Sequence, residues 1–129
     1  EYHAVLNAAA PCDYAPENSR PNKIKTEKLT VNFRKNPDIA AAVGKNKGNA
    51  ALCVFAAETD NLMQNAAAKL KAKNADMIVA NDVLKEGAGF DKDTNIITII
   101  DSEGATEYPM MSKSAAADVI LDRLRRFVK

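Results

Sequence analysis

Short polar side chains follow apolar runs at three places in the chain, and they are the first residues that could do chemistry. Asp13 follows the first run, Glu58 the second, and Asn81 and Asp82 the third. In parallel α/β sheets ligands bind beyond the carboxyl ends of the strands, so these side chains would line one edge of a sheet. Each could instead cap a helix or close a turn, but the same character at three strand ends favours a ligand site.

Two lysine pairs supply the opposite charge. Lys69 and Lys73 are four residues apart, which places them on one face of a helix, where like charges repel unless an anion offsets them. Lys23 and Lys25 flank Ile24 and point the same way in an extended chain. A polyphosphate or a phosphorylated substrate would account for both pairs, and solvated lysines are the common alternative.

Several well-known chemistries have no motif in this sequence. There is no GxxxxGK[ST] loop and no GxGxxG fingerprint, since the GAGF segment at 87–90 lacks the third glycine. His3 is the only histidine, which argues against a Ser-His-Asp triad, a Cys-His pair or a zinc site. We interpret Cys53, inside an apolar run, as a small buried hydrophobe, whereas Cys12 follows a strand and could lie near a site.

Four short apolar runs are the candidate strands of the core. They cover residues 4–9, 51–57, 77–80 and 96–100. Their weak alternation predicts strands covered on both faces, as in a parallel sheet flanked by helices.

Three helices are expected between and after these strands. Asn36-Pro37-Asp38 is a good helix start, with a cap residue, a proline at the first position and an acid in the first turn. Because that acid would repel a phosphate, this end of the helix suits a base or a sugar better. That helix should run to about Val43 and stop near Gly44. A second helix should begin near Thr59 or Asp60, and a third at Ser112 should end the chain. The inner stripe of the second is Leu62, Met63, Ala66, Ala67 and Leu70; that of the third is Ala116, Val119, Ile120, Leu124 and Phe127.

Two further segments modify this plan. Glu103-Gly104 is a turn signal that predicts a hairpin over residues 95–109.

Residues 28–35 alternate strictly between apolar and polar side chains, with Leu29, Val31 and Phe33 on one face. This pattern predicts a peripheral strand, and its apolar face would be covered either by the core of its own chain or by a partner subunit. The expected fold is α/β: a Rossmann-like, mixed but mainly parallel sheet flanked by helices, with a C-terminal antiparallel hairpin and a peripheral flap.

Size and charge bound the remaining possibilities. The 129 residues fit one domain, 1–129, and the formal net charge of +1 gives no field that would indicate a nucleic-acid partner. No apolar run approaches the roughly 20 residues needed to cross a bilayer, and no secretion signal opens the chain, so a reduced cytoplasmic setting is expected. Because a core strand begins almost at once, we expect this chain to be the C-terminal portion of a longer protein whose N-terminal part is absent.

Seven segments, in order, resemble the C-terminal part of phosphopantothenoylcysteine synthetase, a ligase of the coenzyme A pathway. They are AAAPCDYAP (8–16), NKIK (22–25), KNPDIAAAV (35–43), FAAET (55–59), KLKAKNADMIVANDV (69–83), GFDKDTN (89–95) and SK (112–113). The resemblance spans nearly the whole chain, and the ordered set is far more specific than any one segment.

This resemblance implies a reaction. The family joins 4'-phosphopantothenate to L-cysteine: CTP converts the carboxylate to an acyl-cytidylate with loss of pyrophosphate, and the cysteine amine then displaces the nucleotide. Mg²⁺ assists by offsetting phosphate charge. The family is often fused to a flavin-dependent decarboxylase, so FMN would belong to that domain and not to this chain. Family members are homodimers, and the alternating strand with the lysine loop takes part in the dimer.

The resemblance also implies site residues. Asn7, Ala8 and Ala9 would approach the nucleotide, Asp13 would contact it, and Lys23 would bind its phosphates and act in the acyl-nucleotide stage. The remaining nucleotide contacts would come from Pro37, Asp38, Ile39 and Ala40 near the base, from Phe55, and from Lys69 and Lys73. The metal ligands are left open.

The sequence departs from the family at three points. Thr26 replaces the second of two usual lysines, Pro11-Cys12 replaces a small apolar pair, and the family's phosphopantothenate-binding asparagine lies upstream of this chain. The isolated chain is therefore expected to bind nucleotide without turnover. The alternatives are a non-catalytic nucleotide-binding and dimerisation module and, from another class, a fragment of a Rossmann-type oxidoreductase.

Overall fold

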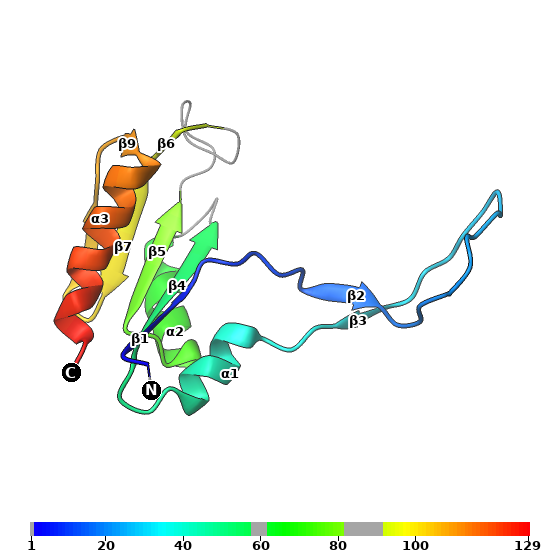
Figure 1. Cartoon of the computed structure of the whole chain (residues 1–129), viewed down its shortest axis with the longest axis horizontal. Helices are drawn as coiled ribbons and strands as arrows, with labels where there is room; N and C mark the ends of the chain where they lie inside the picture. Colours follow the sequence, from blue (N-terminus) through cyan, green and yellow to red (C-terminus); the bar gives the residue numbers. More distant parts are fainter. Residues whose placement is uncertain (1, 58–61, 82–91) are drawn as a thin grey trace.

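A five-stranded mixed sheet forms the centre of the molecule (Figure 1). We describe residues 2–57, 62–81 and 92–129 of a computed structural model. The strand order is β1-β4-β5-β7-β8. The strands are β1 (Ala4–Asn7), β4 (Ala51–Ala57), β5 (Met77–Asn81), β7 (Ile97–Asp101) and β8 (Gly104–Glu107).

Strand direction decides where a ligand can bind. β1, β4 and β5 are parallel, with Leu6 opposite Cys53 and Phe55 opposite Val79, whereas β7 and β8 are each antiparallel to the preceding strand. The expected mixed sheet with an antiparallel end is confirmed. The carboxyl ends of β1, β4 and β5 therefore meet at one edge.

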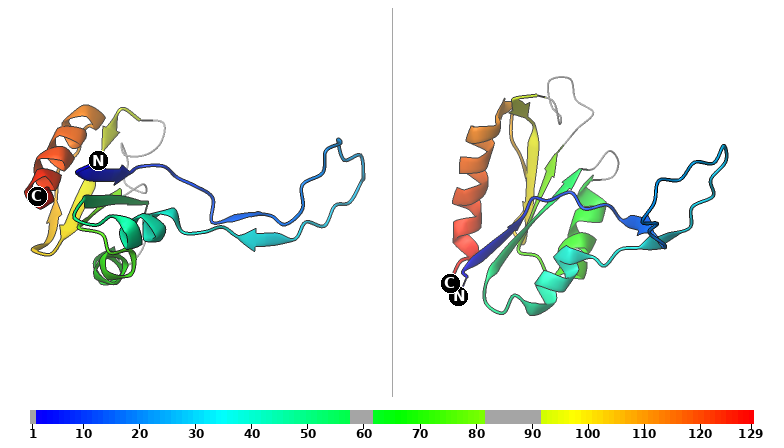
Figure 2. Two further views of the ribbon diagram at one scale, coloured as in Figure 1. Left: turned by 60° about the horizontal axis from the view of Figure 1, so that its bottom comes forward. Right: turned by 45° about the vertical axis from the view of Figure 1, so that its right-hand side comes forward.

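The helices form a layer on each face of the sheet, which Figure 2 shows from the side. α3 (Lys113–Leu124) covers one face, and α1 (Ile39–Asn46) and α2 (Leu62–Lys73) cover the other. Because strand side chains alternate, Cys53 packs toward α3 while Leu52 and Val54 pack toward α1. Cys53 is fully buried, and burial raises the pKa of its thiol to about 12, in line with its expected role as a small hydrophobe.

β1 is shorter than the strand expected from the sequence, and it is not buried on both faces. It ends at Asn7 instead of residue 9, and it lies at the edge of the sheet. Leu6 is 41% exposed, so the prediction that this run is covered on both faces is wrong within this chain. The pattern of small residues 8–10 could not distinguish a strand from the extended linker that follows it.

α1 begins and ends later than its sequence pattern predicts. Asp38, and not Asn36, is the N-cap, because its Oδ1 accepts a hydrogen bond from the N–H of Ala41. The helix then passes through Gly44, which is buried against the last turn of α2. Gly44 serves close packing here and does not end the helix.

The C-terminal elements follow the sequence closely. Ser112 caps α3, and its buried positions are Ala116, Ile120 and Leu124. A short 3-10 turn, η1 (Arg125–Phe127), follows α3 directly. Gly104 has the positive φ of 121° that the β7–β8 hairpin requires. A two-residue pair, β6 (Thr94–Asn95) and β9 (Met111–Ser112), holds the start of α3 beside the sheet.

A long two-stranded arm leaves the body of the molecule between β1 and α1 (Figure 1). Its paired part is short: β2 (Tyr14–Pro16) and β3 (Phe33–Lys35) are antiparallel, and Glu17 N–H donates to the carbonyl of Asn32. The predicted strand over 28–35 is thus a strand only from Phe33. The alternative that its apolar face covers its own core is also wrong, since Leu29, Val31 and Phe33 are 54%, 40% and 60% exposed.

Membrane insertion through a helix is not indicated. Within residues 2–57, 62–81 and 92–129, no helix has both the length and the apolar character needed to cross a bilayer.

Candidate functional site

A cleft of about 620 Å³ lies at the carboxyl edge of the parallel strands. Its walls come from residues 7–14 after β1, residues 35–40 at the start of α1, and residues 54–56 near the end of β4. Lys73 from α2 and Asn81 from β5 complete it. The cleft therefore occupies the position at which parallel α/β sheets bind ligands.

Most of the residues implied by the family resemblance line this one cleft, although they come from distant parts of the sequence. All but Lys23 and Lys69 do so. The lining members of the set are Asn7, Ala8, Ala9, Asp13, Pro37, Asp38, Ile39, Ala40, Phe55 and Lys73.

Asn36 shapes the loop that carries Asp13. Its backbone N–H donates to the carbonyl of Asp13 at 2.8 Å, and its side-chain Nδ2 donates to the carbonyl of Cys12 at 2.8 Å. These two bonds join the segment after β1 to the segment before α1, so the two main walls of the cleft are tied together. The helix-cap pattern assigned Asn36 a different role, and only the fold brings it beside Cys12.

Asp38 and Lys73 place opposite charges in the cleft. The Nζ of Lys73 lies 3.3 Å from Oδ2 of Asp38 and 3.5 Å from its Oδ1. The hydrogen bond from the Ala41 N–H is the main reason that the pKa of the Asp38 carboxyl lies below its ordinary value; partial burial opposes this, and the Lys73 ammonium adds to it. Asp38 is therefore an ionised acceptor at neutral pH.

The other two lysines of the prediction lie elsewhere in this chain. Lys23 is exposed and does not line the cleft of its own chain. It belongs to the segment between β2 and β3, which forms the far part of the arm (Figure 1). Lys69 is half-buried on α2, one turn before Lys73, and is not part of the cleft wall. Sharing a helix face does not bring both ammonium groups into the cleft.

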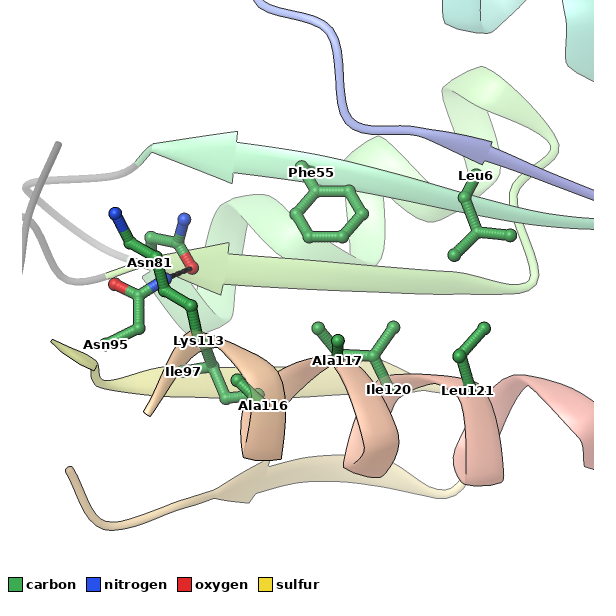
Figure 3. Close-up of a pocket in the computed structure, with 10 residues that line it drawn as sticks. All are labelled: Leu6, Phe55, Asn81, Asn95, Ile97, Lys113, Ala116, Ala117, Ile120 and Leu121. Carbon is green, nitrogen blue, oxygen red and sulfur yellow. Dashed lines mark hydrogen bonds between the residues drawn. The ribbon is translucent and has the colours of Figure 1, made fainter. Parts of the chain in front are cut away.

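A second, smaller cavity of about 280 Å³ lies on the α3 side of the sheet. Figure 3 shows the ring of Phe55 facing Ala117 and Ile120 of α3 across it, and the side chain of Leu6 facing Leu121. Asn81 and Asn95 stand at one end, where Nδ2 of Asn95 donates to Oδ1 of Asn81 at 3.3 Å. Phe55 and Asn81 line both cavities, so they form the boundary between the apolar pocket and the cleft.

Some cleft residues were missed from sequence. Tyr14 and Lys35 line the wall because the β2–β3 pairing places them opposite each other, and Val54 and Ala56 flank Phe55. A period-2 pattern in β4 could have indicated Val54 and Ala56, whereas no local signal pairs residues 14 and 35. Of the polar strand-end residues, Glu58 and Asp82 lie outside the described residues.

Metal binding by the protein alone has little support in the described part of the chain. No group of three or more His, Cys, Asp or Glu side chains there could hold an ion. Mg²⁺ that is held mainly by phosphate oxygens needs only one or two carboxylates from a protein, and Asp13 lines the cleft.

Known proteins resemble this chain over almost its full length. The family model described as "DNA/pantothenate metabolism flavoprotein C-terminal domain" matches residues 1–127. The "Coenzyme A biosynthesis bifunctional protein CoaBC" of Bacillus subtilis (strain 168) is 39% identical over 128 residues, covering 97% of this chain and 32% of that protein.

Two further similarities complete the comparison. A "Cysteine/Cysteine sulfinic acid decarboxylase" from an unknown prokaryotic organism is 45% identical over 125 residues, covering 93% of this chain and 35% of that protein. The crystal structure of the C-terminal domain of CoaBC superposes with a TM-score of 0.73 at 35% identity, covering 95% of this chain and 55% of that one. The chain thus spans about a third of the length of these curated relatives.

Proposed function

This chain belongs to the DNA/pantothenate metabolism flavoprotein C-terminal domain family, and from that premise we propose that it forms the nucleotide-binding part of a phosphopantothenate–cysteine ligase of coenzyme A biosynthesis. One observation carries the proposal. A single cleft at the carboxyl edge of the sheet collects residues that the family resemblance had marked for a nucleotide, from four separate segments of the sequence.

The proposed reaction has two displacements. The carboxylate oxygen of 4'-phosphopantothenate attacks the α-phosphorus of CTP, and pyrophosphate leaves. The amine of L-cysteine then attacks the acyl carbon, CMP leaves, and an amide bond remains. Both steps bring anions together, so the protein must supply positive charge and fix the orientation of the reactants.

The cleft residues have distinct parts in this scheme. Ala8 and Ala9 are small and exposed, so a ligand can approach the backbone beyond β1 closely. Asp13 would be a carboxylate ligand for Mg²⁺ bound with the triphosphate, and the ion would offset the charge of the phosphates. Asp38 at the N-terminus of α1 disfavours phosphate there, which leaves that end of the cleft for the base.

A dimer would reconcile the position of Lys23 with its proposed role. The arm that carries Lys23 exposes Tyr14, Ile24 and Phe33 at 58%, 40% and 60%, and an isolated two-stranded ribbon is marginally stable in water. We propose that the arm packs on a second copy of the chain and delivers Lys23 to the phosphates in the partner's cleft.

The test is an assay of the chain with CTP, phosphopantothenate, cysteine and Mg²⁺, read by pyrophosphate release and by CTP binding. Binding with release supports the ligase. Binding without release is expected of the isolated chain both as a part of the ligase and as a non-catalytic nucleotide-binding and dimerisation module. Binding of NAD but not CTP would instead favour the oxidoreductase alternative, and absence of any nucleotide binding would exclude all three.

Lys23→Ala is the informative variant in this assay. It should weaken CTP binding by about tenfold, because an ammonium–phosphate contact contributes roughly 1.4 kcal/mol or more. Lys45→Ala, on an exposed position of α1 outside the cleft, is the matched control. Lys47, which looks like a loop lysine in the sequence, is unsuitable as a control because its Nζ forms an ion pair with Asp76 at 2.6 Å. Equal effects of Lys23→Ala and Lys45→Ala would contradict the role given to Lys23.

The relative named as a cysteine/cysteine sulfinic acid decarboxylase suggests a second candidate function, favoured by its 45% identity. The same preparation tests it. Carbon dioxide released from cysteine or cysteine sulfinate, without CTP, would favour decarboxylation over ligation.

A further inference from the structure

We propose that the polar end of the smaller cavity, formed by Asn81, Asn95 and Lys113, binds the amino acid that accepts the acyl group in the second step of the proposed reaction. The inference rests on the function proposed above, which makes L-cysteine that acceptor. Lys113 and Asn81 bind its carboxylate, and Asn95 binds its amine. Its side chain enters the apolar part of the same cavity.

Three different elements bring these side chains to one end of the cavity. Asn81 ends β5, Asn95 ends β6, and Lys113 begins α3. The pairing of β6 with β9 holds Asn95 beside the start of α3. Figure 3 shows the three side chains at this end, opposite the end that Leu121 lines. Both amides are half-buried and Lys113 is exposed, so the charged side of the site faces solvent.

The hydrogen bond between the two amides decides which atoms can bind a ligand. Nδ2 of Asn95 donates to Oδ1 of Asn81 at 3.3 Å. This bond leaves Nδ2 of Asn81 as a donor and Oδ1 of Asn95 as an acceptor for a ligand. Together with the ammonium of Lys113, the site offers donors for a carboxylate and an acceptor for an amine. An α-amino acid carries both groups on neighbouring carbons.

The amine must be neutral to attack the acyl carbon, and the site suits that form. Among the described residues that line the smaller cavity there is no carboxylate that would stabilise an ammonium group. The positive charge of Lys113 also disfavours a second one beside it. The neutral amine gives its lone pair to the acyl carbon, and the carbon–oxygen bond to the nucleotide phosphate breaks. CMP leaves with that electron pair, and the nitrogen loses one proton to water.

The boundary between the two cavities places this amine near the acyl group. Asn81 and Phe55 line both the smaller cavity and the nucleotide cleft. A ligand held by Asn81 therefore lies beside the cleft in which the acyl-nucleotide would form. The cavity of about 280 Å³ is wider than a thiol side chain needs, so the carboxylate and the amine, and not the shape of the side chain, provide most of the recognition.

The experiment titrates the whole chain, with CTP and Mg²⁺ present, against three probes. They are L-cysteine, cysteamine, which lacks the carboxylate, and mercaptopropionate, which lacks the amine. Proton–nitrogen NMR spectra report binding through backbone and asparagine side-chain signals. L-cysteine should bind at least about tenfold more tightly than cysteamine, because cysteamine forms no charge-assisted hydrogen bond with Lys113. Mercaptopropionate should bind more weakly than L-cysteine and more tightly than cysteamine.

Three variants assign the preference to these residues. Lys113→Gln should bring the ratio of L-cysteine to cysteamine affinity within about threefold, because the ammonium is lost. Asn95→Asp should tighten cysteamine binding, because a carboxylate stabilises the protonated amine. Lys45→Gln, at an exposed position of α1 outside the cavity, is the control and should leave the ratio unchanged. A thermal melt verifies that each variant is folded.

The outcomes separate this site from the nucleotide site. A preference for L-cysteine that Lys113→Gln removes and Lys45→Gln keeps supports the amino-acid site. Equal binding of L-cysteine and cysteamine by the wild type, or the same loss of preference in both lysine variants, contradicts it. Displacement of L-cysteine by an equal concentration of inorganic phosphate would make this a phosphate site instead. If CTP binds and L-cysteine does not, only the amino-acid site fails; if CTP does not bind, the proposed function fails, and this inference fails with it.

Discussion

At the residue scale, Asp101 is a buried carboxylate in the described core that needs hydrogen-bond donors to remain ionised. Its side chain is fully buried, and Nε of Arg123 donates to its Oδ2 at 2.6 Å while the N–H of Glu103 donates to its Oδ1 at 2.8 Å. Burial alone raises the pKa of the Asp101 carboxyl, but the bonds from Arg123 and Glu103 outweigh it, so the pKa lies below its ordinary value. The carboxylate joins the β7–β8 hairpin to the end of α3.

Arg123→Ala should reduce the free energy of unfolding by about 3 kcal/mol at pH 7, because a buried carboxylate loses its partner. The control is Arg126→Ala, whose guanidinium is 60% exposed and 3.7 Å from Glu103, and which should cost less than about 1 kcal/mol. Urea unfolding measures both. Similar losses for the two variants would show that Asp101 does not depend on Arg123.

The pKa of Asp101 also sets a direction for acid stability. Because the folded-state pKa is depressed, its stabilising contribution is complete above the unfolded pKa of about 3.9 and is lost as pH falls through the folded value. The difference in the free energy of unfolding between wild type and Arg123→Ala should therefore become smaller at low pH. A gap that stays constant from pH 7 to pH 2.5 would contradict this account.

At the scale of elements, the contact between α1 and α2 positions one side of the cleft. Gly44 of α1 lies against the Lys73 carbonyl, and Asn74 adopts a left-handed φ of 46° to end α2 there. Neither helix could approach as closely with a side chain at residue 44.

Gly44→Ala should destabilise the protein by more than about 2 kcal/mol, since the added carbon meets backbone that cannot rotate away. Gly48→Ala is the matched control: it has a φ of 58° and open space around it, so its cost is the conformational strain of about 1 kcal/mol. Thermal unfolding of the two variants compares these costs. A Gly44→Ala variant as stable as Gly48→Ala would mean that the helices can move apart.

At the scale of the whole molecule, the arm carries apolar side chains that the core of its own chain does not bury. It exposes apolar side chains along a ribbon whose paired part is three residues on each strand. Apolar surface on so narrow a ribbon is typical of an interface.

Phe33→Asp should weaken self-association by at least about tenfold without lowering the unfolding midpoint of the core, because Phe33 is 60% exposed and belongs to no core cluster in the described part of the chain. Met110→Asp, also exposed at 47% but outside the arm, is the control. Light scattering after gel filtration measures the molar mass across a concentration series. A wild-type chain that stays monomeric throughout would exclude the dimer.

Local signals in the sequence determined much of this protein. Apolar runs predicted β4, β5 and β7, Glu103-Gly104 predicted the hairpin, and Ser112 marked the start of α3, because propensity, capping and turn chemistry depend on neighbours in the chain. The ordered motifs also indicated the family and most of the cleft residues.

Tertiary structure alone decided which of those residues share a site. It joined Asn36 to Cys12 and Asp38 to Lys73, moved Lys23 out along the arm, and made Gly44 a packing residue instead of a helix end. The physical reason is that these contacts link residues 24 to 35 positions apart, or depend on how closely two helices pack. Neither quantity is encoded in any short stretch of sequence.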